Sequence, residues 1–362
     1  MNRNFFLDLG INFLLESIDP ETNGSRAFYS PLLYPYKFGW SDPYPETTGY
    51  IIKTFDDLIY DNDYQSLEPT NEKMAKWLFS IQMDDGSFSG GLYNINKKNE
   101  KSIFNTAQII IGLFSRFIRT KNEIYLESGL KASNWLGNCI NKSGFFEKYN
   151  YHHGFMPSYY SRVCWPMLLF KDFSGYNREN IKKIKLVINN IIEKKLRNHF
   201  ISDSGFKPNT YAFLHTIAYT IRGLIECSIL LEDKNLFETS IKISEIFIKK
   251  FEIKKKLGGA YHEDFTEISS YRCLTGEAQM VIVWNKISQI SNDLRFYNAG
   301  LKLLDSLVKE VPVKSYPLFA KGGLCGSKPY WGKYISFRQP NWATKFLIDA
   351  ILEEEKTKNL IK

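Results

Sequence analysis

The feature that most restricts the fold of this chain is a glycine-containing loop that recurs along it. Four of these loops pair glycine with a nearby aromatic residue and a fifth is looser; they are residues 85–88, 143–145, 204–206, 258–261 and 322–324. The loops return roughly every 55 to 65 residues, a period typical of proteins built from repeated supersecondary units. The segments between the loops should therefore hold similar structural units.

Each interval contains two segments whose apolar residues are spaced three and four apart, which predicts helices. The segments that end just before a loop are charged on one side, and we expect them to be outer helices at residues 5–16, 71–82, 123–139, 180–196, 236–251 and 293–311. The segments that follow a loop are apolar nearly all round, which is typical of helices buried on every side. We expect these inner helices at residues 48–59, 104–117, 162–170, 213–231, 274–287 and 342–352.

Six outer and six inner helices alternate along the chain, so the predicted fold is all-α and consists of six helical hairpins. Six hairpins can stack as an open solenoid or close into an (α/α)6 toroid, because both arrangements bury a continuous core between neighbours. The loops that lead into inner helices are long and rich in Trp, Tyr, Gly and charge, whereas the opposite connections are short. One functional rim on a closed ring fits this asymmetry better, and we predict a single toroid domain over residues 1–362.

The bulk composition argues against several classes of partner. The formal net charge of +8 comes with lysine runs at residues 182–185 and 254–256, which suit a solvated outer face better than a nucleic-acid site. The amino terminus has no long apolar core and no later window is apolar for long enough, so we expect neither a signal peptide nor a membrane span. Five widely separated cysteines without a CxxC pair favour a reducing compartment. We expect a cytoplasmic protein, and the sequence leaves its oligomeric state open.

Some stretches resemble the terpenoid cyclase and protein prenyltransferase toroids. Residues 82–88 (QMDDGSF), followed by residues 104–108 (FNTAQ), resemble the Q-x-x-D-G-S-[FW] repeat and the next inner helix, and residues 322–329 (GGLCGSKP) are similar to the GG-x-x-x-K-P loop of prenyltransferase β subunits. The resemblance implies the toroid fold over most of the chain. It does not imply the activity, because residues 61–64 (DNDY) lack the last Asp of the D-x-D-D acid and residues 56–61 (DDLIYD) lack the spacing of a magnesium-binding DDxxD. We interpret both stretches as a charged helix end.

Prenyltransferase β subunits and lanthionine cyclases, another toroid family, hold a catalytic zinc through cysteine and histidine. Cys273 heads one predicted inner helix, Cys325 lies in the last loop, and two histidines lie near two other helix starts, so a distributed site is conceivable. The two histidines are His215 and His262. Zinc sites generally contain at least one pair of ligands close in sequence. The lanthionine C-H-G motif is absent, because Leu274 follows Cys273. We therefore expect structural cysteines, no metal and no cofactor.

A third resemblance is to bacterial (α/α)6 sugar-processing proteins, which include unsaturated-uronide hydrolases, polysaccharide lyases and sugar epimerases. Residues 40–50 (WSDPYPETTGY), 214–219 (LHTIAY) and 274–279 (LTGEAQ) have the character of the segments that begin inner helices in those proteins. The resemblance implies carbohydrate chemistry without assigning one family.

Two carboxylates, Asp42 and Glu46, lie among two prolines and the aromatic residues Trp40 and Tyr44, just before a predicted inner helix. Proline stiffens such a segment and restricts the residue before it, so the directions of Asp42 and Tyr44 are set in advance. The alternative is helix capping, in which one of the threonines at 47–48 is the N-cap and Glu46 complements the helix dipole. Capping does not require the two aromatic residues. We therefore keep Asp42 and Glu46 as catalytic candidates, and Trp40 and Tyr44 as substrate-binding candidates.

A second group of ionisable residues precedes another inner helix. Tyr271 and Arg272 come just before it, and Glu277 lies in its first turn. A carboxylate at this place either pairs with Arg272 or has a raised pKa that suits a general acid. We keep Glu277 as a catalytic candidate with Tyr271 assisting it, and Arg272 as a ligand for an anionic group; pairing alone is the alternative.

His215 has Tyr211 one turn earlier and Tyr219 one turn later on the same predicted helix face. This arrangement would allow His215 to transfer a proton while the two tyrosines stack on a sugar. A hydrogen-bonded core histidine is the alternative.

The last loop is aromatic and basic, and it contains Lys328, Tyr330, Trp331 and Tyr334. Aromatic rings stack on the apolar faces of sugars, and lysine binds a carboxylate or sulfate. We therefore expect these four residues to bind substrate, and the lysines favour an acidic saccharide over a terpene. A surface for docking another protein is the alternative.

The sequence thus predicts a carbohydrate-active enzyme that acts on an acidic poly- or oligosaccharide, of the hydrolase, lyase or epimerase type found in bacterial surface polysaccharide metabolism. An isoprenoid-type toroid, and a non-catalytic toroid that binds a glycan or a protein, stay open as alternatives.

Overall fold

The chain divides into two compact units, each built from separate stretches of sequence. A computed structural model describes residues 3–33, 36–60, 64–94, 100–315 and 319–361. The α2–α7 unit contains residues 18–27 and 42–195, and the α8–α12 unit contains residues 1–17, 28–41 and 196–362. That residues 1–362 form a single domain stays a prediction.

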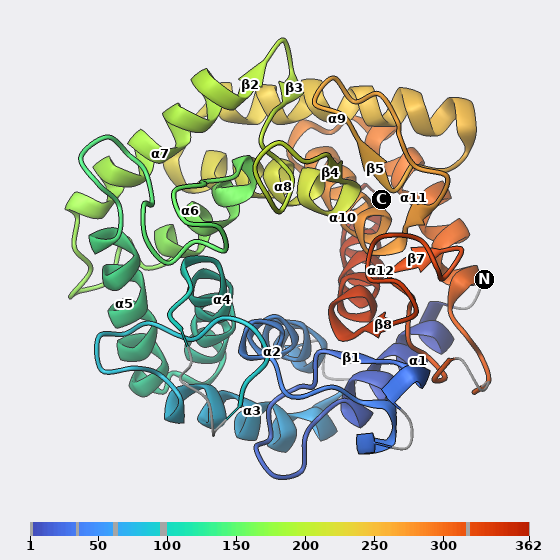
Figure 1. Ribbon diagram of the computed structural model, residues 1–362, viewed down its shortest axis with the longest axis horizontal. Coiled ribbons are helices and arrows are strands. Elements are labelled where there is room, and N and C mark those ends of the chain that lie inside the picture. Colours follow the sequence, from blue (N-terminus) through green and yellow to red (C-terminus); the bar gives the residue numbers. More distant parts are fainter. Residues whose placement is uncertain (1–2, 34–35, 61–63, 95–99, 316–318, 362) are drawn as a thin grey trace. The chain divides into compact units, whose positions relative to one another are not determined.

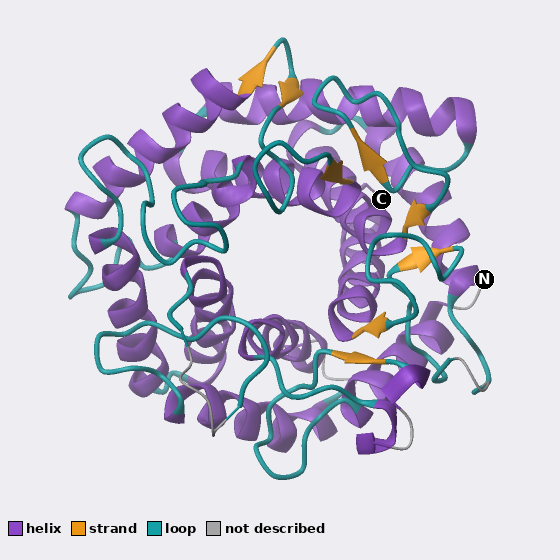
Figure 2. Cartoon of the chain, viewed as in Figure 1, coloured by secondary structure: helices purple, strands orange, loops and turns teal. Residues whose placement is uncertain are grey.

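Helices dominate both units, as the spacing of apolar residues predicted (Figure 2). The described residues form twelve α-helices: α1 Arg3–Glu16, α2 Pro45–Tyr60, α3 Glu68–Ser80, α4 Ile103–Thr120, α5 Glu123–Asn138, α6 Ser161–Leu168, α7 Glu179–Lys195, α8 Leu214–Leu231, α9 Lys234–Lys254, α10 Leu274–Ser291, α11 Leu294–Leu307 and α12 Asn341–Ile361. Each predicted inner and outer helix overlaps one of them, so the all-α prediction is confirmed. Five short 3-10 helices accompany them at Pro31–Leu33, Tyr36–Gly39, Gln65–Leu67, Ser158–Tyr160 and Val308–Glu310.

In the α2–α7 unit the predicted inner helices α2, α4 and α6 pack side by side, and α3, α5 and α7 cover them (Figure 1). Two glycines allow α2 and α4 to approach closely. A Cβ atom added at Gly112 would lie 2.5 Å from the carbonyl oxygen of Gly49, and one added at Gly49 would lie 2.7 Å from the Cα of Ile109. The close approach brings the first turns of α2 and α4 together, and both contribute to the candidate site described below.

In the α8–α12 unit α10 packs against α8 and α12, with α9, α11 and α1 outside them (Figure 1). The contrast in burial follows the sequence pattern: α10 buries side chains around its whole circumference, whereas α9 buries one side and carries exposed lysines on the other. A Cβ added at Gly276, in the first turn of α10, would lie 2.7 Å from the backbone nitrogen of His215 in α8. Glycine at this position therefore sets the spacing of the two helix starts.

Short strands connect the loops of the α8–α12 unit, and sequence periodicity did not predict them. They are β1 Phe28–Tyr29, β2 Leu196–Arg197, β3 Phe200–Ile201, β4 Ala212–Phe213, β5 Ala260–Tyr261, β6 Arg272–Cys273, β7 Ser327–Lys328 and β8 Gln339–Pro340. All four pairs are antiparallel: β1 with β8, β2 with β3, β4 with β5 and β6 with β7. The strands β4, β6 and β8 each run directly into an inner helix. Backbone hydrogen bonds thus anchor the loops that precede α8, α10 and α12.

A buried ion cluster joins α2, α3 and α4 in the other unit. The Arg116 side chain is fully buried and contacts carboxylate oxygens of Asp56 at 2.7 Å, Glu68 at 2.6 Å and Glu72 at 2.8 Å. Asp56, predicted to belong to a charged helix end, is therefore a buried ion-pair partner. The predicted charged turn at 61–63 lies outside the described residues.

Helix α8 is long and apolar enough to cross a membrane by length and composition, which corrects the expectation that no window of the sequence has that character. Within the described residues it is the one helix of this kind, and 72% of its 18-residue window is buried inside the protein. Its apolar surface is covered by α9, α10 and neighbouring loops, which is the burial of a core helix.

Candidate functional site

The strongest candidate for chemistry in the α2–α7 unit is the buried carboxylate of Glu46. Helix α2 begins at Pro45, so Glu46 lies in its first turn. The Tyr44 hydroxyl donates to Oε2 of Glu46 at 2.7 Å, and the Tyr50 hydroxyl donates to Oε1 at 3.0 Å. Glu46 is only 8% exposed. Both carboxylate oxygens are therefore held in fixed directions by phenol groups from the same segment.

The pKa of Glu46 is raised above its ordinary value, because burial disfavours the charged carboxylate. The hydrogen bonds from Tyr44 and Tyr50 and the positive charge of Arg162 act in the opposite direction and limit the rise. A carboxyl group with a raised pKa keeps its proton to higher pH than an ordinary carboxyl group and can deliver it to a bound substrate. This is the electrostatic setting of a general acid.

Arg162 is the cation whose positive charge lowers the pKa of Glu46. It was not among the residues predicted from the sequence. It lies in the first turns of α6 and is 4% exposed. Its guanidinium carbon is 5.4 Å from the ring centre of Tyr50 and 5.2 Å from that of Trp165. Contacts with two aromatic rings hold the planar guanidinium in one orientation. An Arg flanked by aromatic residues at the start of an otherwise apolar helix was the signal that could have revealed it.

The first turn of α4 adds a third polar group. With its amide nitrogen facing the carboxylate, Asn105 donates to Oε2 of Glu46 at 3.1 Å and its oxygen accepts from the Gly91 backbone N–H at 3.3 Å. The starts of α2, α4 and α6 thus supply Glu46, Asn105 and Arg162 to one polar cluster. We call these three residues with Tyr44 and Tyr50 the Glu46 cluster.

The remaining candidates of the segment before α2 have other surroundings. The capping alternative with a threonine at 47–48 as N-cap is wrong, because α2 begins before both residues. Asp42 is half-buried, and its carbonyl oxygen accepts from the Ala27 N–H at 3.2 Å. Trp40 packs within the α8–α12 unit, with its ring centre 5.1 Å from Phe13 and 5.6 Å from Tyr29. Trp40 is therefore a core side chain, and the substrate contact expected of it has no support.

In the α8–α12 unit His215 is the centre of a separate aromatic cluster. Nδ1 of His215 lies 3.1 Å from Oε1 of Gln279 in α10. The contact fixes the orientation of the imidazole ring, and which of the two groups donates depends on the tautomer of His215. The Tyr219 ring centre is 4.2 Å from that of His215, and the Tyr334 ring centre is 5.1 Å away. We call these four residues the His215 cluster.

Tyr334 belongs to this buried cluster rather than to an exposed aromatic loop. Its side chain is 2% exposed, and its hydroxyl oxygen accepts from the Trp342 indole N–H at 3.0 Å. Tyr211 also differs from the prediction. Because β4 occupies the residues before α8, Tyr211 lies outside the helix, and its ring contacts Phe213 at 5.4 Å instead of stacking one turn before His215. The predicted position one helical turn from His215 is confirmed for Tyr219 and is wrong for Tyr211.

At the start of α10, Glu277 forms an ion pair with Arg272, which was one of the two predicted alternatives. Glu277 is fully buried and accepts from Arg272 through Nε at 3.0 Å and Nη2 at 2.6 Å. It also accepts from the Leu257 backbone N–H at 3.2 Å. Burial raises the pKa of Glu277, while the Arg272 charge and hydrogen bonds oppose the rise. Arg272 also binds Glu310 at 2.7 Å, so its guanidinium is occupied by two carboxylates instead of being presented to an anionic ligand.

Tyr271 is buried, and its hydroxyl has no hydrogen-bond partner among the described residues. Burial raises the pKa of this phenol well above its usual range. The ring fills space next to Gly259, where an added Cβ would lie 2.3 Å from Cε2 of Tyr271. These contacts give it a packing role, and the predicted assistance to Glu277 has no contact to support it.

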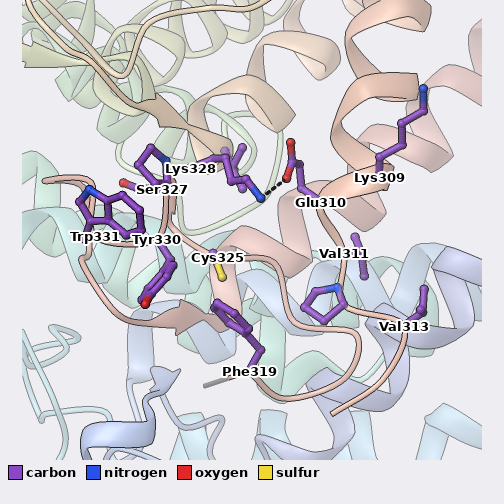
Figure 3. A pocket seen from close by; sticks show the side chains of 13 residues that line it. Lys309, Glu310, Val311, Val313, Phe319, Cys325, Ser327, Lys328, Tyr330 and Trp331 are labelled. Atoms are coloured by element: carbon purple, nitrogen blue, oxygen red, sulfur yellow. Dashed lines mark ion pairs between the residues drawn. The ribbon is translucent and has the colours of Figure 1, made fainter. Parts of the chain in front are cut away.

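The other residues of the last loop line a pocket of about 850 Å³ in the same unit. Lys328, Tyr330 and Trp331 face it, together with residues 309–313 and Phe319 (Figure 3). The Lys328 ammonium pairs with Glu310 at 3.0 Å. The predicted substrate-binding residues of this loop therefore divide between two places, Tyr334 in the His215 cluster and the other three in the pocket.

The two cysteines considered for zinc have the environment of structural thiols. Both thiols are buried, and burial raises the pKa of Cys273 and of Cys325 to about 12. Cys273 is the N-cap of α10 and accepts from the Gly276 N–H at 3.4 Å. Over the described part of the chain, no three His, Cys, Asp or Glu side chains gather as a metal site.

Comparison with known proteins links the chain to solved structures alone. No protein-family model matches the sequence, and no curated protein matches it either. An unsaturated glucuronyl hydrolase specific for heparin has 14% identity and a TM-score of 0.74, with 99% of each chain covered. A sugar epimerase from a ruminal bacterium has 13% identity and a TM-score of 0.72, with 97% of each chain covered. A cellobiose 2-epimerase from Spirochaeta thermophila has 11% identity and a TM-score of 0.71, with 98% of this chain and 94% of that chain covered.

The likeness extends over nearly the whole of each chain and defines the fold. The protein has the (α/α)6 toroid fold of six helical hairpins. The toroid prediction is confirmed, and the open solenoid is excluded.

Proposed function

We propose that this protein is a carbohydrate-active enzyme that acts on an acidic poly- or oligosaccharide, with Glu46 as a proton-transferring residue. The observation that carries the proposal is the Glu46 cluster: a buried carboxyl group with a raised pKa, held by two phenols beside a buried arginine. Solved proteins of the same fold described as a glucuronyl hydrolase, sugar epimerases and a D-mannose isomerase support the substrate class.

The cluster supports a proton transfer common to hydrolases, lyases and epimerases. Protonated Glu46 can donate to a departing or developing sugar oxygen, and ionised Glu46 can accept the proton of a water or a carbon next to a carbonyl. Tyr44 and Tyr50 stabilise the ionised form and keep the carboxylate in place between the two states. The His215 cluster supplies, in the α8–α12 unit, an imidazole oriented by Gln279, and imidazole suits the same kind of chemistry.

Arg162 supports the acidic nature of the substrate. Its guanidinium lies close to the rings of Tyr50 and Trp165, and an arginine beside the candidate acid suits the carboxylate of an acidic sugar. We further propose a cytoplasmic location, because all five cysteines are free thiols.

The test compares Glu46→Gln with the control Asp57→Asn, which removes a half-exposed carboxylate of the same helix. Both are assayed on unsaturated uronic-acid disaccharides and on cellobiose, with product formation followed by chromatography. Loss of a general acid or base should reduce kcat by about 100-fold or more, while Asp57→Asn should remain within about twofold of the unchanged protein. A Glu46→Gln variant with unchanged turnover would refute the role of Glu46.

The pH profile gives an independent readout. If Glu46 acts as an acid, activity is present below its raised pKa and is lost as the pH rises through it. The Tyr50 hydroxyl lowers this pKa, so Tyr50→Phe should move the alkaline limb to higher pH. A limb that moves to lower pH, or not at all, would contradict the assignment. Arg162→Gln should raise KM for uronic-acid substrates and leave KM for neutral ones unchanged.

A further inference from the structure

The pocket of the α8–α12 unit is separate from the Glu46 and His215 clusters, because no residue of either cluster lines it. It has a volume of about 850 Å³, within the range of pockets that hold small ligands. Its lining comes from the end of the Val308–Glu310 turn, from the segment 311–313, from Phe319 and from the loop 325–331. These segments meet around one hollow, shown in Figure 3.

Most of the lining is apolar. Leu274, Val311 and Cys325 are buried in the wall, and Phe319 and Val313 extend the apolar surface towards solvent. Val313 is 44% exposed. A hollow of this composition favours a hydrocarbon or aromatic group, because such a group loses contact with water on entering it.

An aromatic wall completes the apolar surface. The Trp331 side chain is 59% exposed, and its ring meets that of Tyr330 edge to face with centres 5.1 Å apart. Tyr330 in turn contacts Phe319 at 5.3 Å and Phe337 at 5.3 Å. Ring contacts with Phe319 and Phe337 thus hold Tyr330 in place, and the exposed ring of Trp331 lines the pocket beside it. Large exposed aromatic side chains in such a setting commonly mark binding surfaces.

The charged side chains that line the pocket include one more cation than anion. Glu310 is paired with Arg272 at 2.7 Å and with Lys328 at 3.0 Å (Figure 3). Arg272 is also paired with Glu277. Among the described residues no ion pair is formed by Lys309, an exposed residue of the pocket lining whose ammonium points away from the hollow in Figure 3. Rotation about its flexible four-carbon stem brings the ammonium to the rim of the hollow. The rim therefore carries an excess of positive charge, and its one carboxylate is already neutralised.

From this distribution we infer that the pocket binds a small amphipathic anion, with an acyl or aryl body against Val311, Phe319 and Trp331 and an anionic end at Lys309 and Lys328. The anionic group can be a carboxylate or a phosphate, since a lysine ammonium binds either as a point charge. We assign the pocket a binding role, because its one carboxylate, Glu310, is engaged in ion pairs with Arg272 and Lys328. This role is independent of the function proposed for Glu46.

Isothermal titration calorimetry with decanoate, decyl phosphate and the uncharged 1-decanol tests the inference below the concentrations at which these compounds aggregate. We expect saturable binding of one anion per chain, with 1-decanol at least about tenfold weaker. Tenfold corresponds to one charge-assisted contact. The two anions distinguish a carboxylate site from a phosphate site by their relative affinities.

Variants locate the binding. Lys309→Ala and Trp331→Ala remove exposed side chains and should each weaken binding about tenfold, with circular dichroism confirming that the helices remain. Lys302→Ala, which removes another exposed lysine of the same region, should leave binding unchanged. Glu46→Gln should also bind the anion normally, so a failure of the proposed enzymatic function would not be mistaken for a failure of this site. No saturable binding, equal affinity for 1-decanol, or unchanged affinity in both pocket variants would overturn the inference.

Discussion

Replacement of Arg116 by methionine should destabilise the α2–α7 unit strongly. Arg116 is fully buried and bonds to three carboxylates, Asp56, Glu68 and Glu72. Methionine fills much of the same volume but removes the closer of the two cations that face the buried carboxylate of Asp56, leaving Arg119 at 4.0 Å. Removal of one member of a buried ion pair costs about 3–5 kcal/mol, a large part of the 5–15 kcal/mol that stabilises a typical protein domain.

The pH dependence separates charge from packing. Burial raises the pKa of Asp56 to about 6 even with Arg116 present. For a carboxyl group with a raised folded-state pKa, the stabilising contribution is present below the unfolded value of 3.8 and is lost as the pH rises through the folded value. Loss of Arg116 raises the pKa of Asp56 further. The penalty of Arg116→Met should therefore be smaller at pH 5, where Asp56 is protonated, than at pH 7, by up to about 2 kcal/mol.

Urea unfolding followed by tryptophan fluorescence at both pH values measures the effect, since Trp77 lies in α3, the helix that carries Glu68 and Glu72. Arg295→Met is the matched control: Arg295 also pairs with two carboxylates, but its side chain is 68% exposed, so its loss should be far smaller. The double variant Arg116→Met with Asp56→Asn should be more stable than Arg116→Met alone. Equal losses for Arg116→Met and Arg295→Met, or a penalty that is larger at pH 5, would refute this account.

Two further predictions concern the helices. Gly112→Ala should cost about 1–3 kcal/mol, because the added Cβ would lie 2.5 Å from the carbonyl oxygen of Gly49; thermal unfolding measures this, and an unchanged Tm would show that α2 and α4 can separate freely. Asp233→Ala should cost about 1 kcal/mol, because Asp233 accepts from the N–H groups of Asn235 and Leu236 at the start of α9. For that variant a Tm equal to that of the unchanged protein would mean that solvent replaces the cap without cost.

The helices could be predicted from the sequence because the buried side of a helix requires apolar residues at regular spacing. Residues of α10 are apolar on every side and are buried on every side, whereas α9 alternates buried apolar residues with exposed lysines. The paired strands produce no such regular pattern in the sequence. β4 and β6 are two residues long, too short for an alternating pattern, and their hydrogen bonds go to loops about 50 residues away in the chain.

The candidate site could be predicted where the interacting side chains belong to one short segment of the sequence. Glu46 and Tyr44 stand in a proline-stiffened segment, and the two side chains are hydrogen-bonded. Arg162 was missed because it was assigned to the apolar body of an inner helix, and its cation–π contact with Tyr50 joins two hairpins. The partner of Glu277 was predicted as one of two alternatives, because Arg272 is only five residues away. Local pairs can be found in a sequence, whereas pairs between hairpins require the fold.

The strand pairs of the α8–α12 unit have a consequence for how such a protein can change. The loop before α8 is hydrogen-bonded through β4 to the loop after α9, and the loop before α10 is hydrogen-bonded through β6 to the loop before α12. A loop exchanged for that of another toroid would arrive without the backbone partner that its neighbour needs. Recombination should therefore succeed when adjacent loops are transferred together, and new specificities in this unit should be acquired in blocks rather than one loop at a time.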